Sequence, residues 1–397
     1  LVEAWRADDV PRALAAIEEG VAAGLTAGGY CSYELGYVFE PRLQPLLPAL
    51  SSPLLRFHLF AEAQRLSAEA RDRWLSERAH GAAVSSAFSP SMSGERHRTK
   101  VARVRQLIGD GDVYQVNLTL KLKGAANGDP FATYAALRAK ARSGACAFLR
   151  FTDEDILSFS PELFFRVRDC RIEARPMKGT AERAPDVRSD ERRRRALVEE
   201  EKQRAENLMI VDLLRNDLAR VSKAGSVRVT DLFTVESYPR FHTLTSGISA
   251  ELDGNVSLSR ILPALFPCGS VTGAPKIRAM EIIREVEDEP RGAYCGAVGY
   301  AQRDTMAFNV AIRTLVLRDC NAEMGIGGAI VWDSQARAEY EECLLKARFL
   351  TDPDQPFRLI ETMRWTPDAG FNLLSRHLER LRASSSYFGF QFDHAAV

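Results

Sequence analysis

Apolar residues recur at helical spacing early in the chain and alternate with polar residues in many later segments. Spacings of three and four predict helices over residues 10–23 and 67–79. Between Arg96 and Leu350, further helical patterns alternate with short β-like runs, among them CAFLRF, ILSFSPELFFRV and CRIEARP. This alternation favours an α/β or α+β core in which helices cover the sheets.

Two breaks divide the chain into three parts. Residues 80–94 are rich in Ala, Ser and Gly around Pro90, which is typical of a surface loop. Residues 351–356 (TDPDQP) follow a helical pattern that ends near Leu350. We therefore predict an N-terminal part over 1–94 and a main region over 95–351, which share one fold. Residues 357–397 read as strand, turn and amphipathic helix, too little for an independent core, so we expect a fragment of a second domain.

A charged run precedes the most regular amphipathic pattern of the chain. In residues 189–207 Arg and Glu occur at helical spacing, which favours a solvated, ion-paired helix face over nucleic-acid binding. A core-facing stripe then follows, made of Leu208, Val211, Leu214, Leu218 and Val221. Glu206 lies about 120° around the wheel from this stripe. It can be a helix-end charge favoured by the dipole, or it can point into a cavity.

The predicted helix over 338–349 carries Glu339, Glu342 and Lys346 on one face, while Glu341 points elsewhere, toward solvent. One interpretation is a surface ion pair between Glu342 and Lys346. The other is a pair of carboxylates for a hard divalent cation, with a lysine for an anion. Mg²⁺ commonly takes one or two protein carboxylates and fills its other positions with water or substrate.

Two glycine-rich stretches offer backbone groups to a ligand. PCGSVTGAPK (residues 267–276) precedes a helix with Pro275 in its first turn, so its N–H groups could bind a carboxylate or phosphate, or simply cap the helix. It lacks the order of a nucleotide P-loop. MGIGGAIVWDS (residues 324–334) permits close approach of the backbone to a ligand.

Lys178 in RPMKGT follows a β-like run and lies sixteen residues after Glu162 of FSPELFF. A lysine at a strand end is usually solvated. It becomes a nucleophile only where burial or neighbouring cations lower its pKa from about 10.4.

Charge and composition exclude several classes of protein. Lys and Arg (53) balance Asp and Glu (53), so no global positive field attracts nucleic acid or anionic lipid. No apolar run is long enough to cross a bilayer. The seven cysteines form no C-x-x-C pair, and no secretion signal is visible, so we expect a cytoplasmic protein. Because the chain begins at Leu1, we expect its true N-terminus to be missing.

Six motifs in consistent order resemble the chorismate-utilising enzyme family, and within it the first component of aminodeoxychorismate synthases. They are SPE, RPMKGT, RAENLMIVDLLRNDLARV, GSVTGAPK, AIRT and AEYEEC, and SYELGY resembles the N-terminal part of the same enzymes. The resemblance implies an α+β fold with two mostly antiparallel sheets sandwiched together, covered by helices, with the active site in a cleft. The tail, with LIETMRW and LLSRHLERLRASSSYFGF, resembles the start of an aminodeoxychorismate lyase, a pyridoxal-phosphate enzyme.

The resemblance also implies the roles of individual residues. Lys178 would be the covalent nucleophile, Glu162 the general acid, and His242 a residue near the reacting ring. Glu206 and Glu342 match carboxylates that hold Mg²⁺, with Glu339 close by. The carboxylates of chorismate would meet a larger set: Gly269, Ser270, Thr272, Gly273, Arg313, Gly327, Gly328 and Lys346. Gln115 stands where isochorismate and salicylate synthases have a water-activating lysine, which disfavours water as the nucleophile.

These roles imply amination of chorismate, with ammonia supplied by a separate glutamine amidotransferase subunit. Lys178 disfavours the nearest alternative, the first component of anthranilate synthase, whose corresponding motif has alanine. A noncatalytic docking subunit would need neither Lys178 nor Glu162. Since the remainder of the lyase is absent from this sequence, we expect no bound pyridoxal phosphate and no lyase activity. The balanced charge and the short apolar runs predict no nucleic-acid or membrane partner.

Overall fold

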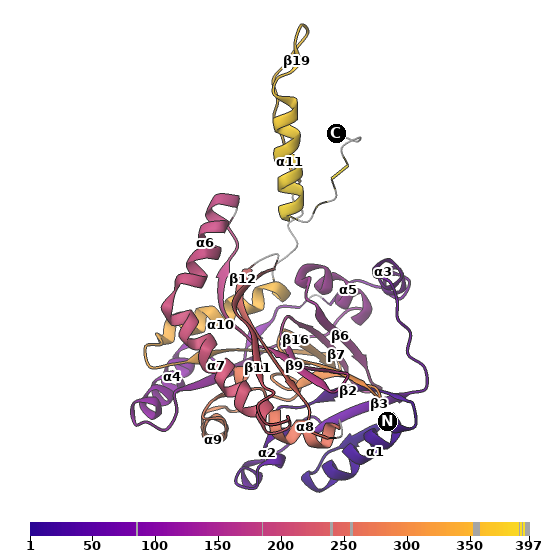
Figure 1. Ribbon diagram of the computed structural model, residues 1–397, viewed down its shortest axis with the longest axis vertical. Helices are drawn as coiled ribbons and strands as arrows, with labels where there is room; N and C mark the ends of the chain where they lie inside the picture. Colours follow the sequence, from indigo (N-terminus) through magenta and orange to yellow (C-terminus); the bar gives the residue numbers. More distant parts are fainter. Residues whose placement is uncertain are drawn as a thin grey trace.

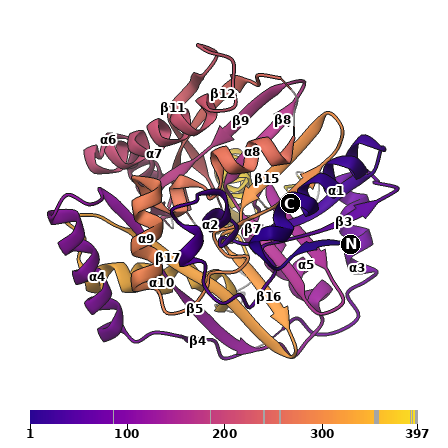
Figure 2. The same ribbon diagram turned by 90° about the horizontal axis from the view of Figure 1, so that it is seen from below.

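A computed structural model describes residues 1–84, 86–184, 186–238, 241–254, 257–351, 358–388, 390 and 392–393. Two antiparallel sheets form its centre (Figures 1 and 2). The larger runs in the order β1 (Val2–Ala4), β3 (Leu55–Phe60), β2 (Thr26–Cys31), β14 (Ala297–Ala301), β15 (Thr305–Val310), β8 (Leu163–Arg168), β9 (Arg171–Arg175), β12 (Phe241–Glu251) and β10 (Met177–Glu182), with β11 (Arg228–Ser237) also paired to β12.

The second sheet runs in the order β13 (Gly273–Ala274), β5 (Gln115–Ala125), β17 (Asn321–Ile330), β16 (Thr314–Arg318), β7 (Asp155–Ser160) and β6 (Ala145–Arg150), and β4 (Ser89–Pro90) pairs with β5. The two sheets face each other, since Tyr30 and Val298 of the first share a buried apolar cluster with Ile156 of the second. The predicted α+β sandwich is therefore confirmed.

Helices cover the outer faces of both sheets. They are α1 (Val10–Ala22), α2 (Leu35–Phe39), α3 (Ala68–Ser76), α4 (Gly94–Gly109), α5 (Pro130–Ala141), α6 (Val187–Glu199), α7 (Glu201–Ala219), α8 (Leu258–Leu265), α9 (Lys276–Val286) and α10 (Ala336–Thr351), with short 3-10 turns η1 (Ala7–Asp9), η2 (Gln44–Leu46) and η3 (Gly269–Val271). The main core joins α1, α7, α8 and α9 to the larger sheet, and a second core joins α5 and α10 to the smaller one. No helix within the described ranges is long and apolar enough to cross a membrane.

The C-terminal segment stands out from the rest of the molecule (Figure 1). It contains the hairpin β18 (Trp365–Thr366) and β19 (Gly370–Phe371), followed by α11 (Leu374–Phe388). The turn and the helix are where the sequence predicts them. The predicted boundary at 351–356 lies outside the described residues from 352 onward.

Strand β12 shows how the sequence positions the site. Its apolar residues Leu244, Ile248 and Ala250 are buried in the core, and the intervening threonines lie on the opposite face. Thr243, on that opposite face, lines the large cavity described below. Alternation along one strand therefore builds the core and a wall of the cavity together.

Candidate active site

One cavity of about 960 Å³ lies where the two sheets meet helices α7 and α10. Residues from β10, β12, β17 and η3 form its walls, and both helices contribute charged side chains. Of the residues predicted to carry the chemistry, nine line it: Glu162, Lys178, Glu206, Ser270, Arg313, Gly327, Glu339, Glu342 and Lys346. The fold therefore gathers residues that are up to 184 positions apart (162 to 346) around one space.

Lys178 enters the cavity from β10, beside a bulge. Strand β10 pairs Lys178 with Leu244 of β12, and the register then shifts before Thr180. Gly179 makes this shift possible, since its φ of +84° is one that other residues rarely adopt. The Thr243 hydroxyl donates a 2.8 Å hydrogen bond to the Gly179 carbonyl and pins the bulge.

The environment of Lys178 shifts its protonation equilibrium toward the neutral amine. Burial lowers its pKa; Glu206 acts in the opposite direction, and the positive charge of Lys346 lowers the pKa further. A neutral amine is the nucleophilic form of lysine. Burial and a neighbouring cation therefore lower the pKa of Lys178, as a reactive lysine requires.

Glu162 lines the same cavity between β7 and β8 and is only 3% exposed. Burial raises its pKa to about 7, although the Ser270 hydroxyl and the charge of Lys178 favour the ionised form. A carboxylic acid with this pKa holds its proton near neutral pH and can donate it. One cavity thus holds an amine with a lowered pKa, Lys178, and a carboxyl group with a raised pKa, Glu162.

Three carboxylates face the cavity from two helices, Glu206 from α7 and Glu339 and Glu342 from α10. Burial raises the pKa of Glu206 and of Glu339, and the negative charge of Glu342 adds to both effects. Glu342 forms a 2.9 Å ion pair with Lys346, which outweighs burial and lowers its pKa. The ion pair between Glu342 and Lys346 that the sequence suggested therefore exists, but it lies in the wall of the cavity and not on the outer surface.

Such hard oxygen donors suit Mg²⁺. Within the ranges that the structure describes, no group of three or more histidine, cysteine or acidic side chains is arranged to hold a metal ion. The carboxylates therefore fit Mg²⁺ only as one or two ligands whose remaining partners are water or substrate oxygens.

Two basic side chains, Arg313 and Lys346, also line the cavity. Arg313 has a left-handed φ of +50° and places its guanidinium 4.3 Å from the centre of the Phe241 ring. Burial lowers its pKa to about 10. Lys346 donates a 2.9 Å hydrogen bond to the Gly327 carbonyl, which holds its ammonium group beside β17. These two cations can meet the carboxylates of a dianionic substrate.

Several predicted residues lie behind the cavity wall. Gly269, Thr272, Gly273 and Gly328 do not line it; the Thr272 hydroxyl instead donates to the Cys268 carbonyl at 2.8 Å. Gln115 is fully buried in β5 and does not reach the cavity either. Residues 324–330 of the second glycine-rich stretch form the end of β17, and residues 331–334 follow that strand.

His242 also lies behind the wall, with its ring turned away from the cavity. Its Nδ1 atom is 2.8 Å from the Ser237 hydroxyl, and its Nε2 atom is 3.0 Å from Asp190. Its neighbours Phe241 and Thr243 line the cavity instead. Strand alternation explains this arrangement, because residues 242 and 243 must face opposite sides of β12.

Several lining residues were not predicted from the sequence, chiefly Asn117, Arg183, Lys202, Gln203, Phe241 and Thr243. Lys202 and Gln203 lie one helical turn before Glu206, so the same helical spacing could have identified them. Arg183 belongs to no recognised motif. Its position becomes visible only when β10 is placed beside β12.

Comparison with known proteins agrees with this fold and site. Residues 3–352 match the family of chorismate binding enzymes, and the chain belongs to that family. It is 39% identical over 332 residues to aminodeoxychorismate synthase component 1 of Escherichia coli (strain K12), covering 79% of this chain and 73% of that protein. Anthranilate synthase component 1 of Aquifex aeolicus is 40% identical over a shorter 251 residues, 63% of this chain and 51% of that protein.

Solved structures show the same architecture. Anthranilate synthase component I from Streptococcus pneumoniae superposes with a TM-score of 0.70 at 30% identity, covering 83% of this chain and 80% of that one. The isochorismate synthase MenF from Escherichia coli has a TM-score of 0.67 at 19% identity, covering 89% and 84%, and supports the fold alone. Residues after 352 lie outside the family match.

Proposed function

We propose that this protein aminates chorismate to 4-amino-4-deoxychorismate through a covalent bond to Lys178. The observation that carries the proposal is the pairing of Lys178, whose pKa is lowered, with Glu162, whose pKa is raised to about 7, in one cavity. The relatives named aminodeoxychorismate synthase component 1 support the same reaction.

The two residues divide the reaction into two displacements. The neutral Lys178 amine forms a bond to the chorismate ring carbon beside the carboxylate-bearing carbon, while the ring hydroxyl leaves as water with the proton of Glu162. Ammonia then attacks the vacated carbon and expels the Lys178 amine. Atoms balance, since chorismate and ammonia give the amino product and water.

The charged walls would orient the substrate. Arg313 and Lys346 would bind carboxylate groups, and Glu206 and Glu342, with Glu339 nearby, would hold Mg²⁺ against the ring carboxylate. The ion would offset negative charge there. Because His242 does not reach the cavity, we assign it a positioning role for β12.

We also propose that ammonia comes from a separate glutamine amidotransferase, in line with the component 1 names of the relatives, and that the protein works in the cytoplasm. For residues 357–397 we propose the start of a lyase domain. Its support is the resemblance of that segment, together with a family match that ends at residue 352. We expect this chain to bind no pyridoxal phosphate.

Anthranilate synthesis is the second candidate, favoured by the relative from Aquifex aeolicus. The two are separated by mass spectrometry of the products after incubation with chorismate, Mg²⁺ and ammonium. We expect aminodeoxychorismate without release of pyruvate. Anthranilate with pyruvate would overturn the proposal in favour of the second candidate.

The covalent role is tested with Lys178→Ala, matched by Lys202→Ala in the same cavity. We expect the amination rate to fall at least about a hundredfold in Lys178→Ala, where slow direct addition of ammonia would account for the remaining activity. The rate of the control should fall only slightly. Equal rates for wild type and Lys178→Ala would exclude the covalent step.

A further inference from the structure

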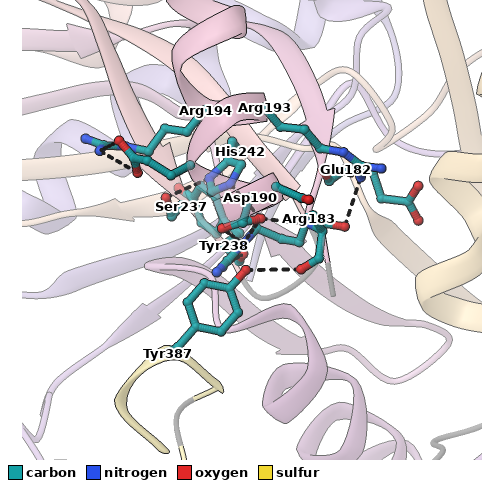
Figure 3. Close-up of polar contacts among 12 residues, drawn as sticks. Glu182, Arg183, Asp190, Arg193, Arg194, Ser237, Tyr238, His242 and Tyr387 are labelled. Carbon is teal, nitrogen blue, oxygen red and sulfur yellow. Dashed lines mark hydrogen bonds and ion pairs between the residues drawn. The ribbon is translucent and has the colours of Figure 1, made fainter. Parts of the chain in front are cut away.

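The C-terminal helix meets the rest of the molecule at a polar cluster behind the cavity wall, which we call the Asp190 cluster. It consists of Arg183, Asp190, Ser237, His242 and Tyr387 (Figure 3). Four of these residues belong to the main body, and Tyr387 belongs to α11. The two parts of the chain are therefore in contact at this place.

Asp190 is the centre of the cluster. Its carboxylate accepts from Arg183 Nε at 2.9 and 3.0 Å and from the Ala184 backbone N–H at 2.8 Å, and it lies 3.0 Å from His242 Nε2. Burial would raise its pKa, but these groups, together with the Tyr387 hydroxyl, lower it to about 2. Asp190 is thus a fixed negative charge around which the other side chains are ordered.

Tyr387 is the contribution of α11 to the cluster. Its hydroxyl donates a 3.2 Å hydrogen bond to the Ala184 carbonyl, and the Arg183 guanidinium lies 4.4 Å from the centre of its ring. Arg183 in turn donates to the Tyr238 carbonyl at 3.0 Å and lines the cavity. One arginine therefore connects a tyrosine of the tail with the wall of the active site.

The cluster holds the far end of the strand that carries Lys178. Ala181 of β10 pairs with His242 of β12, and Arg193 of α6 donates to the carbonyls of Glu182 and Arg183 at 2.8 and 3.0 Å. Lys178 is four residues before Glu182 on the same strand, next to the Gly179 bulge. A bulged strand near a sheet edge is easily displaced unless its end is fixed.

We propose that Tyr387 is a positioning residue for the amination site, and that α11 acts through the Asp190 cluster to hold β10 and the amine of Lys178. The inference rests on the proposed function for its kinetic consequence, but not for its structural one. Loss of one hydrogen bond and one cation–π contact is expected to change a local equilibrium about tenfold.

The test compares Tyr387→Ala and Tyr387→Phe in the full chain. As a matched control, Tyr300→Ala removes a tyrosine of β14 that is 43% exposed and outside the cavity. Hydrogen exchange of peptides covering 177–184 needs no substrate. We expect exchange to be about tenfold faster than in the wild type for Tyr387→Ala. The increase should be smaller for Tyr387→Phe, which keeps the ring under Arg183, and the exchange rate of the control should be unchanged.

Two further readouts separate positioning from loss of folded protein. The labelling rate of Lys178 by an amine-reactive reagent is divided by that of the exposed Lys223 in the same molecule, which corrects for protein and reagent concentration, and urea unfolding of each variant gives the unfolded fraction to be subtracted. We expect Tyr387→Ala to change this ratio about threefold or more, and to lower kcat/KM for chorismate by about five- to tenfold. Tyr387→Phe should recover most of both.

Unchanged exchange and unchanged labelling in Tyr387→Ala would overturn the proposal, and so would faster exchange with wild-type kinetics. Failure of the proposed function has a different signature, since the wild type would then form no aminodeoxychorismate. Exchange and labelling would still decide the role of Tyr387 in that case.

Discussion

At the scale of single residues, Glu162 must satisfy two opposing demands. Burial raises the pKa of its carboxyl group from the usual range to about 7, and in the proposed reaction this raised pKa lets the group keep a proton for the leaving hydroxyl. At pH values below the pKa of Glu162 in the unfolded chain, the group is protonated in both states, and its ionisation does not affect the free energy of unfolding. As the pH rises toward 7, only the unfolded state ionises, and stability is lost.

Glu162→Gln is therefore expected to be inactive and yet more stable at alkaline pH. At pH 8 the gain should approach about 3 kcal/mol in the free energy of unfolding, and it should vanish near pH 4, where both states of the wild type are protonated. Urea unfolding of both proteins at the two pH values measures it. A gain of the same size at both pH values would show that ionisation is not its origin.

The structure brings some of the predicted site residues to the cavity and leaves others behind its wall; their chemical roles stay predictions. Lys178, Glu162 and Arg313 line the cavity as expected. His242 and Gln115 do not line it. His242 lies on the opposite face of β12 from Phe241 and Thr243, and the pattern did not reveal which face meets the cavity. Gln115 shares a face of β5 with the lining residue Asn117, but it lies at the buried start of that strand, short of the cavity. Tyr387 could not be linked to the site at all, since its contact with Ala184 spans 203 positions.

At the scale of elements, α10 presents one face to the cavity and another to solvent. Glu342 lines the cavity, whereas Glu341 forms an exposed i,i+4 pair with Arg337 at 2.8 Å. Glu342→Gln should raise the Mg²⁺ concentration needed for half-maximal rate by about tenfold, and Glu341→Gln should not. Rates measured across a magnesium titration test this. An unchanged requirement in Glu342→Gln would remove that residue from the ligand set.

Helix α10 also packs on α4 through a buried histidine. The His97 ring is fully buried, with its centre 5.3 Å from that of Tyr340, and burial lowers its pKa. The unfolded chain therefore binds a proton more readily, and stability should fall as the pH drops below about 6.5. His97→Phe should flatten this decline in thermal unfolding curves, while His80→Gln, at an exposed position, should not.

The elements themselves were largely predictable, but not how each one faces its neighbours. The helical pattern over 208–221 falls on α7 as far as Ala219, where the helix ends, yet Leu208 is exposed, whereas Asn207 and Asp217 are buried. Asp217 is buried because Lys276 of α9 donates to it at 2.6 Å, a contact across 59 positions. The charged run is solvated at Glu191, Arg194 and Arg195 as expected, but Asp190 within it turns inward.

At the scale of the whole molecule, the order of the strands in each sheet could not be predicted from the sequence. Strand β14, from residues 297–301, lies between β2 and β15, and β17 lies between β5 and β16. Hydrophobic alternation assigns strands without saying which strands pair, because long-range pairing is fixed by the packing of the complete sandwich. The cavity forms only from that pairing.

At the same scale, the proposed amination depends on the protonation of two groups, the Glu162 carboxyl and the ammonia substrate. Ammonia attacks only as NH₃, whose fraction rises with pH, while Glu162 loses its proton above a pKa of about 7. At matched concentrations of free NH₃, the rate of amination by the wild type should therefore fall as the pH rises from about 7 to about 9. Initial rates with ammonium salts measure this.

Glutamine as the only nitrogen source should give no product, because we place glutamine hydrolysis on a separate subunit. A glutamine-dependent rate by the chain alone would contradict that assignment.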